Sequence, residues 1–288
     1  MLKQRTLKTT IKTTGVGLHT GARVEIVLRP APPDTGIVFH RVDLAAAGRH
    51  SRRRAQRRRY AAVVDARAAT APRFRTVEHL MSALAGLGID NLHVDVAGPE
   101  IPIMDGSAGP FVFLLQSAGI VEQAVAEALS AHPVDRSKCA TATSGRASIR
   151  YNGFKLDFTI DFPHPMFGSR EPAAWSIDFA EHSYVKEVGR ARARSASCRT
   201  SRRCARPAWR WAAACRTPIV LDEYRVLNSE GLRYDNEFVK HKVLDAIGDL
   251  YLLGHPLIGK YTRVQVGTRA QQRVVARAAQ RVRMRGSW

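Results

Sequence analysis

The chain lacks any apolar run long enough to cross a membrane as a helix, which takes about 18 consecutive apolar residues. Its first segment, residues 1–21, alternates polar and apolar side chains and has no apolar core of the kind found in a secretory signal peptide. We therefore expect a protein with no integral membrane segment, located in the cytoplasm.

Cysteine is also scarce. Four cysteines occur in 288 residues, and their spacings match no common zinc or redox motif: Cys139, Cys198, Cys204 and Cys215. Unpaired thiols are typical of a reducing compartment, in which disulfides do not persist. The pattern excludes a disulfide-stabilised secreted scaffold and indicates that these cysteines are incidental.

Acidic residues are nearly absent from three segments, 49–75, 186–217 and 260–288. These segments hold 28 Lys and Arg residues but only two acids, Asp65 and Glu187. Because the whole chain has a net charge of +20, the remaining residues carry −6 and resemble a mildly acidic soluble protein. A high positive charge ordinarily suggests nucleic acid or an anionic membrane surface as partner, but here the excess is local.

Two interpretations of the Arg-rich segments remain open. Basic insertions that bind polyanions would make the chain a polyanion-binding protein, which is the alternative function. Tracts such as 52–59 and 199–211 have neither strand nor helix periodicity, however, and only Trp209 and Trp211 are interleaved with the arginines. We favour out-of-frame translation of a GC-rich gene, because Arg and Ala have GC-rich codons and the segment boundaries are abrupt. We therefore expect no nucleic-acid partner, and translating the coding DNA of residues 45–75 in the other two frames tests the idea.

Outside those segments, the chain alternates strand and helix patterns, which predicts an α+β fold. The predicted elements are strands at 24–28, 36–39, 153–162 and 174–179 and helices at 77–87 and 235–253. A boundary near 125–130 divides them. We expect an N-terminal α+β domain at 1–127 and a C-terminal α+β domain at 128–288, in which 132–148, 191–217 and 263–288 are atypical.

Two short stretches, one in each predicted domain, read as halves of a metal site. His241 and Asp245 are four residues apart on the second predicted helix, so they share one face and can bind the same ion. Glu78 and His79 are neighbours near the start of the first helix, so one can ligate while the other acts as a general base. Together they offer three protein ligands, an open position and a base, as catalytic zinc requires.

The less specific interpretation also remains open, because a His and an acid at this spacing commonly form a surface pair or a satisfied polar pair. Asp249 continues the same helix face one turn on and could orient a ligand or a catalytic His. A location between two domains would suit such a site, because ligands often bind there.

Longer motifs then carry a family resemblance. They are GVGLHTG at 15–21, DTGIVFHR at 34–41, TVEHLMSALAGLGIDN at 76–91, PIMDGSAGPFVF at 102–113 and the run from VLDEYRVLNSEGLRYDNEF to VKHKVLDAIGDLYLLG at 220–254. With their flanks these stretches cover over half of the chain. It resembles the zinc-dependent UDP-3-O-acyl-N-acetylglucosamine deacetylases of lipid A biosynthesis, and the long motifs argue against a zinc hydrolase with another substrate.

The resemblance implies an activity and a set of residues. Zn²⁺ would be held by His79, His241 and Asp245, and Glu78 would take a proton from the attacking water. The remaining implied residues are Lys240 as a substrate or oxyanion contact, Asp249 as a residue that orients a catalytic His, and His19 near the mouth of the substrate site. The implied substrate is a UDP-linked acylated glucosamine, UDP-3-O-(3-hydroxyacyl)-N-acetylglucosamine, whose acetamide is hydrolysed to release acetate in the committed step of lipid A synthesis.

The resemblance also implies two similar domains, each a β-sheet packed on helices, with zinc at their interface, in a monomer. Two positions depart from the family. By spacing, Thr268 stands where the family has a catalytic His, and Ala193 follows Arg190-Ala191-Arg192 where the family has an oxyanion-stabilising Thr. Residues 45–75 replace a strand region that shapes the acyl-chain site. We therefore expect this polypeptide to bind zinc poorly or not at all and to deacetylate negligibly.

Overall fold

A computed structural model describes residues 3–46, 74–126, 130–131, 144–149, 151–161, 173–193, 219–221 and 225–266. Thr268 and most of the Arg-rich tracts that motivate the polyanion-binding alternative lie outside these ranges. The helices are α1 (Val42–Ala46), α3 (Glu78–Leu87), α4 (Gly109–Ala118), α5 (Tyr184–Glu187) and α7 (Glu237–Tyr251).

The strands of the N-terminal part form a four-stranded sheet and a two-stranded ribbon. The sheet has the order β2-β3-β5-β4, with β4 parallel to β5 and the other pairs antiparallel. The strands are β1 (Lys3–Leu7), β2 (Ile11–Val16), β3 (Arg23–Pro30), β4 (Ile37–Arg41), β5 (Leu92–Val96) and β6 (Ile120–Ala126), of which β1 and β6 form the ribbon.

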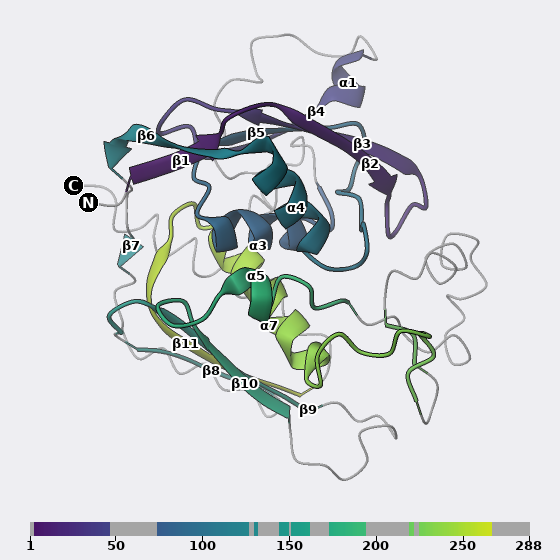
Figure 1. Ribbon diagram of the computed structural model, residues 1–288, viewed down its shortest axis with the longest axis vertical. Helices are drawn as coiled ribbons and strands as arrows, with labels where there is room; N and C mark the ends of the chain where they lie inside the picture. The colour runs from purple at the N-terminus through teal and green to yellow at the C-terminus, as the bar shows by residue number, and fades with distance from the viewer. Residues whose placement is uncertain are drawn as a thin grey trace.

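The later strands form a second, five-stranded sheet. Its path is β10-β9-β11-β7, and β8 pairs with β11 beside that path. The strands are β7 (Ser130–Ala131), β8 (Ser144–Ile149), β9 (Phe154–Asp161), β10 (Ala173–Asp178) and β11 (Leu257–Val266). Figure 1 shows the two sheets on opposite sides of a layer that contains α3, α4, α5 and α7. The expected α+β character is confirmed.

The elements predicted from periodicity are confirmed within one or two residues at each end. The helices predicted at 77–87 and 235–253 are α3 and α7, and β3, β4, β9 and β10 cover the four predicted strands. Helix α3 ends where Gly88 adopts a left-handed conformation, φ 63° and ψ 47°, a conformation that glycine adopts without a side-chain clash. Gly86 lies inside the helix.

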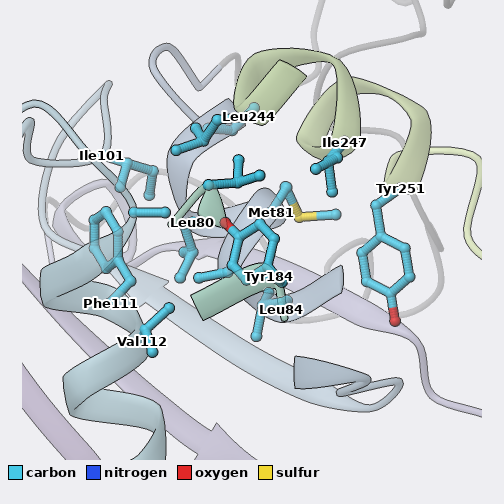
Figure 2. Packing of buried hydrophobic residues seen from close by; sticks show 14 of the residues in the cluster. Leu80, Met81, Leu84, Ile101, Phe111, Val112, Tyr184, Leu244, Ile247 and Tyr251 are labelled. Atoms are coloured by element: carbon cyan, nitrogen blue, oxygen red, sulfur yellow. The ribbon is translucent and has the colours of Figure 1, made fainter. Parts of the chain in front are cut away.

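The core lies between the sheets and is centred on α3. On β3, alternate residues Val24, Ile26 and Leu28 are buried, as expected for a strand with one face on the core. Figure 2 shows Leu80, Met81 and Leu84 of α3 packed among side chains of α4, α5 and α7: Phe111, Val112, Tyr184, Leu244, Ile247 and Tyr251. Helix α3 is therefore buried on several sides, and its position is set by its neighbours.

The backbones of α3 and α7 approach each other closely in this layer. A Cβ atom placed on Gly248 would overlap the carbonyl oxygen of Glu78 and lie 3.0 Å from the backbone nitrogen of Ser82. Because backbone atoms cannot rotate away, only glycine fits at residue 248 without moving one helix from the other.

We expect Gly248→Ala to lower the free energy of unfolding by about 1–3 kcal/mol, the usual range for overpacking. The sign is informative, because Gly→Ala in a helix interior otherwise adds about 1 kcal/mol of stability. Urea denaturation followed by circular dichroism measures the change. Gly189→Ala is the matched control, since its added Cβ would lie 3.4 Å from Tyr184, an ordinary contact. Equal stability of Gly248→Ala and the wild type would contradict the tight crossing.

A histidine pair on the outer face of the first sheet makes stability depend on pH. His40 Nε2 lies 3.1 Å from His93 Nδ1, and Arg29 and Asp95 are the charged groups facing the pair. Burial lowers the pKa of both histidines; Arg29 lowers both further, His40 lowers that of His93, and Asp95 opposes the shift.

A histidine whose folded pKa lies below its unfolded value stabilises the protein above the unfolded pKa, and this contribution is lost as the pH falls. We therefore expect stability to fall from about pH 7.5 to about pH 5.5, across the unfolded histidine pKa of about 6.5. His40→Gln should lose less stability than the wild type over the same interval, measured by thermal unfolding at each pH. Parallel losses in the two proteins would show that the pair does not contribute.

Candidate metal centre

Helices α3 and α7 bring together the two half-motifs that the sequence separates by more than 150 residues. His79 Nε2 lies 3.7 Å from Asp245 Oδ1, and His241 Nε2 lies 3.3 Å from the same oxygen. The two imidazole rings meet edge to face with centroids 5.1 Å apart, and one ligand atom from each residue lies within 4.8 Å of the others. All three side chains are buried.

The donor atoms of this triangle fit a divalent cation. Among the described residues, Asp245 Oδ1 is a buried atom without a hydrogen-bond partner, and it is the oxygen that the Nε2 atoms of His79 and His241 approach. His241 Nδ1 lies 2.9 Å from the carbonyl oxygen of Ala191, which can only accept, so Nδ1 carries the proton and Nε2 presents its lone pair to the triangle. Two imidazole nitrogens and one carboxylate oxygen are a usual set of ligands for zinc.

Protonation states agree with this role. Burial lowers the pKa of His241 to about 4, so its ring is neutral at pH 7 as ligation requires. Burial acts to raise the pKa of Asp245, but His241, Lys242 and His79 hold it well below its usual range. Burial acts to lower the pKa of His79, but Asp245 and Glu78 raise it overall. The two carboxylates therefore favour positive charge beside His79.

The triangle lines a cavity of about 220 Å³. Residues from both halves of the chain form its wall: Leu18, Thr76, Glu78, His79, Ile103, Arg192, Ala193, Phe238, His241, Lys242 and Asp245. Glu78 lines the cavity but is not part of the triangle, which leaves its carboxylate available as a base.

The other residues singled out in the sequence lie elsewhere. Lys240 is absent from the described cavity wall; its ammonium group bonds Glu187 Oε2 at 2.9 Å and lies 4.6 and 4.3 Å from the ring centres of Trp175 and Tyr234. Lys242 lines the cavity instead and donates to Asp245 Oδ2 at 2.8 Å. The cation nearest the triangle is therefore the lysine that follows His241, which sequence reasoning missed although it stands next to a ligand.

His19 and Asp249 also lie outside the described cavity wall. The backbone N–H of His19 donates to Glu100 Oε2 at 3.0 Å, and the fully buried Glu100 carboxylate also accepts from the backbone and hydroxyl of Thr20. This clamp holds the loop whose Leu18 side chain forms part of the wall. Burial, with added repulsion from Asp245 and Glu78, raises the pKa of Asp249 to about 8.

Arg192 anchors the wall on the C-terminal side. It is completely buried although it stands in a segment whose composition is atypical. Its Nε donates to Glu237 Oε1 at 2.9 Å, its Nη1 to Glu230 Oε1 at 2.9 Å, and its Nη2 to the Gly231 carbonyl at 2.7 Å. The anchor fixes residues 191–193 against the start of α7, which places the Ala191 carbonyl on His241.

Removal of Arg192 would leave the buried Glu237 carboxylate without its cation, so we expect Arg192→Ala to destabilise the fold by about 3–5 kcal/mol. Chemical denaturation measures the loss. Lys3→Ala is the control: it breaks an exposed pair with Glu122, at 3.8 Å, and should cost about 1 kcal/mol or less. Similar losses in the two variants would show that the buried network does not stabilise this part of the chain.

A buried triangle of two histidines and an aspartate, with a second carboxylate and a lysine in the same cavity, is the arrangement of a metal-dependent hydrolase. The model of the UDP-3-O-acyl N-acetylglycosamine deacetylase (LpxC) family matches residues 4–280. A UDP-3-O-acyl-N-acetylglucosamine deacetylase from Thioalkalivibrio sulfidiphilus (strain HL-EbGR7) is 47% identical over 290 residues, spanning 96% of this chain and 89% of the relative.

The chain belongs to the UDP-3-O-acyl N-acetylglycosamine deacetylase family. The family resemblance stated from the motifs is thereby confirmed, as is the expectation of a deacetylase. None of the helices in the described part of the chain is long and apolar enough to span a membrane.

Proposed function

We propose that the cavity is the active site for hydrolysis of the acetamide of UDP-3-O-(3-hydroxyacyl)-N-acetylglucosamine, which releases acetate in the committed step of lipid A synthesis. The observation that carries the proposal is the convergence of His79, His241 and Asp245 beside Glu78 in one buried cavity. The relative is named for a UDP-3-O-acyl-N-acetylglucosamine, and the 3-hydroxyacyl group is what the family resemblance adds to that substrate. The proposed setting is a cytoplasmic monomer.

His79, His241 and Asp245 would hold Zn²⁺ through two imidazole nitrogens and one carboxylate oxygen. Bound there, zinc would supply Lewis acidity, which makes water a better nucleophile near neutral pH and polarises an amide carbonyl. The Ala191 carbonyl keeps His241 in the required tautomer, and Lys242 holds the second oxygen of Asp245, so both ligands are oriented before an ion arrives.

Glu78 is the proposed general base. Its carboxylate lines the cavity without belonging to the triangle, so it can accept a proton from the water that attacks the acetamide carbon. The ammonium group of Lys242, in the same wall, adds positive charge where the carbonyl oxygen becomes negative. The ammonium group of Lys240 contacts the rings of Trp175 and Tyr234 and the carboxylate of Glu187. It is therefore better suited to hold α7 in position than to contact substrate.

The proposed architecture follows the expected division into domains at 1–127 and 128–288. The lining residues of the cavity between Leu18 and Ile103 belong to the first domain, and those between Arg192 and Asp245 belong to the second. This division supports a zinc site at the interface of the two domains.

We also propose that turnover by this chain is slow. The leaving amine needs a proton, and Thr268, in the place of the family's histidine, has no group that titrates near neutral pH. Ala193 lines the cavity with a methyl group where the family has a hydroxyl. Loss of a general acid typically lowers the rate by about 10²–10⁴-fold.

From the sequence we expect poor zinc binding, but the buried triangle and the oriented ring of His241 support binding instead. We therefore predict about one zinc ion per chain, measured by elemental analysis after dialysis against a zinc-buffered solution. Asp245→Ala should lose the metal, because two imidazoles alone bind it weakly. Glu78→Gln should retain it and release acetate more slowly still than the already slow wild type, by about 10²-fold or more. Retention of zinc by Asp245→Ala would contradict the assignment of the ligands. Rapid acetate release by the wild type would contradict the proposed slow turnover.

A further inference from the structure

Thr76, three residues before the proposed ligand His79, has a backbone conformation that its side chain disfavours. Its φ is 58°, in the left-handed region, which is unusual for a residue branched at Cβ. Backbone hydrogen bonds hold both neighbours of Thr76. The Arg75 N–H donates to the Pro99 carbonyl at 3.0 Å, and the Val77 carbonyl accepts from the Met81 N–H at the start of α3. Neighbouring structure therefore imposes the conformation, as is typical of functional positions.

The hydroxyl of Thr76 carries a second unfavourable feature. The residue is 8% exposed, and among the described residues no partner lies within hydrogen-bond distance of its Oγ1. Thr6 shows the ordinary arrangement: it is equally buried, but its Oγ1 donates to the Asn91 carbonyl at 2.7 Å and accepts from Ala31 N–H at 3.1 Å. A buried hydroxyl without a partner destabilises the folded state.

The position of Thr76 indicates what its hydroxyl is for. Thr76 lines the cavity with Glu78 and His79, and no other described residue of the cavity wall has a hydroxyl group. The two cationic wall residues have partners already: Arg192 binds Glu237 and Glu230, and Lys242 binds Asp245. Thr76 therefore brings to the wall a neutral hydroxyl donor that has no partner among the described residues.

We propose that Thr76 Oγ1–H donates a hydrogen bond to an oxygen of the acetyl group, the carbonyl oxygen of the acetamide before hydrolysis and a carboxylate oxygen of acetate afterwards. Both oxygens can only accept, so a hydroxyl donor complements them. The inference rests on the proposed function and adds to it a substrate contact that compensates in part for Ala193. The buried, unpartnered hydroxyl and the strained backbone are then the features of a site built before its ligand arrives.

Thr76→Val removes the hydroxyl and keeps the branched shape. With acetate as the probe, isothermal titration of the zinc-loaded protein should show a dissociation constant about 10–100-fold higher than that of the wild type, the usual contribution of one hydrogen bond to a charged group. Zinc content should not change, and the melting temperature should hold or rise, because an unsatisfied buried hydroxyl is gone. A purely structural threonine would give the opposite result, a lower melting temperature with unchanged acetate affinity.

Thr6→Val is the matched control, because it removes an equally buried hydroxyl that has partners. It should lower the melting temperature and leave acetate binding unchanged. Thr76→Ser, which restores the donor, should bind acetate within about 2-fold of the wild type. Wild-type affinity in Thr76→Val, or an equal loss in Thr76→Ser, overturns the inference, as does a zinc-loaded wild type that binds no acetate. A wild type that takes up no zinc overturns the proposed function. In that case the acetate affinities of the metal-free wild type and metal-free Thr76→Val are compared: weaker binding by Thr76→Val supports the role of the Thr76 hydroxyl, and equal binding overturns it.

Discussion

The structure depends on the close crossing of α3 and α7 at Gly248. With no side chain at that residue, the backbone of α7 lies against the carbonyl of Glu78, and the two helices approach more closely than side chains would allow. His79 follows Glu78 directly, and His241 and Asp245 lie on the same helix as Gly248. The crossing thus sets the distances among the three ligands, and the surrounding core of Leu80, Leu84 and Ile247 keeps it fixed.

Around that crossing, two buried charges hold the cavity wall in place. Glu100 holds the loop that carries Leu18, and Arg192 holds the segment whose Ala191 carbonyl orients His241. Both residues are fully buried and make several hydrogen bonds, which offset the loss of hydration. The wall and the proposed ligands are therefore held by the same packed layer. A substitution of Glu100 or Arg192 would shift the positions of the triangle residues.

The chemistry of the site is uneven. The proposed ligands, the proposed base Glu78 and the cation of Lys242 line one cavity. We propose that Thr268 and Ala193 stand where the family has a proton donor and an oxyanion hydroxyl, so that the proposed site would hold a metal ion and an acetyl group more readily than it would turn the substrate over. Thr76 has a left-handed backbone and a buried hydroxyl without a partner among the described residues, and it is the wall residue that we propose as a further donor to the acetyl group.

The sequence by itself predicted six elements outside the Arg-rich segments, α3, α7, β3, β4, β9 and β10, and its motifs named the three residues of the candidate metal triangle. Periodicity encodes α3, α7, β3 and β9, and a spacing of four puts His241 and Asp245 on one helix face whatever the helix packs against. Only the tertiary structure decided that Lys242 lines the cavity while Lys240 lies among aromatic rings, and that Arg192 and Thr76 are buried. Those outcomes depend on which neighbour each face of α7 meets and on how Thr76 is pinned between two elements, and neither is a property of local sequence.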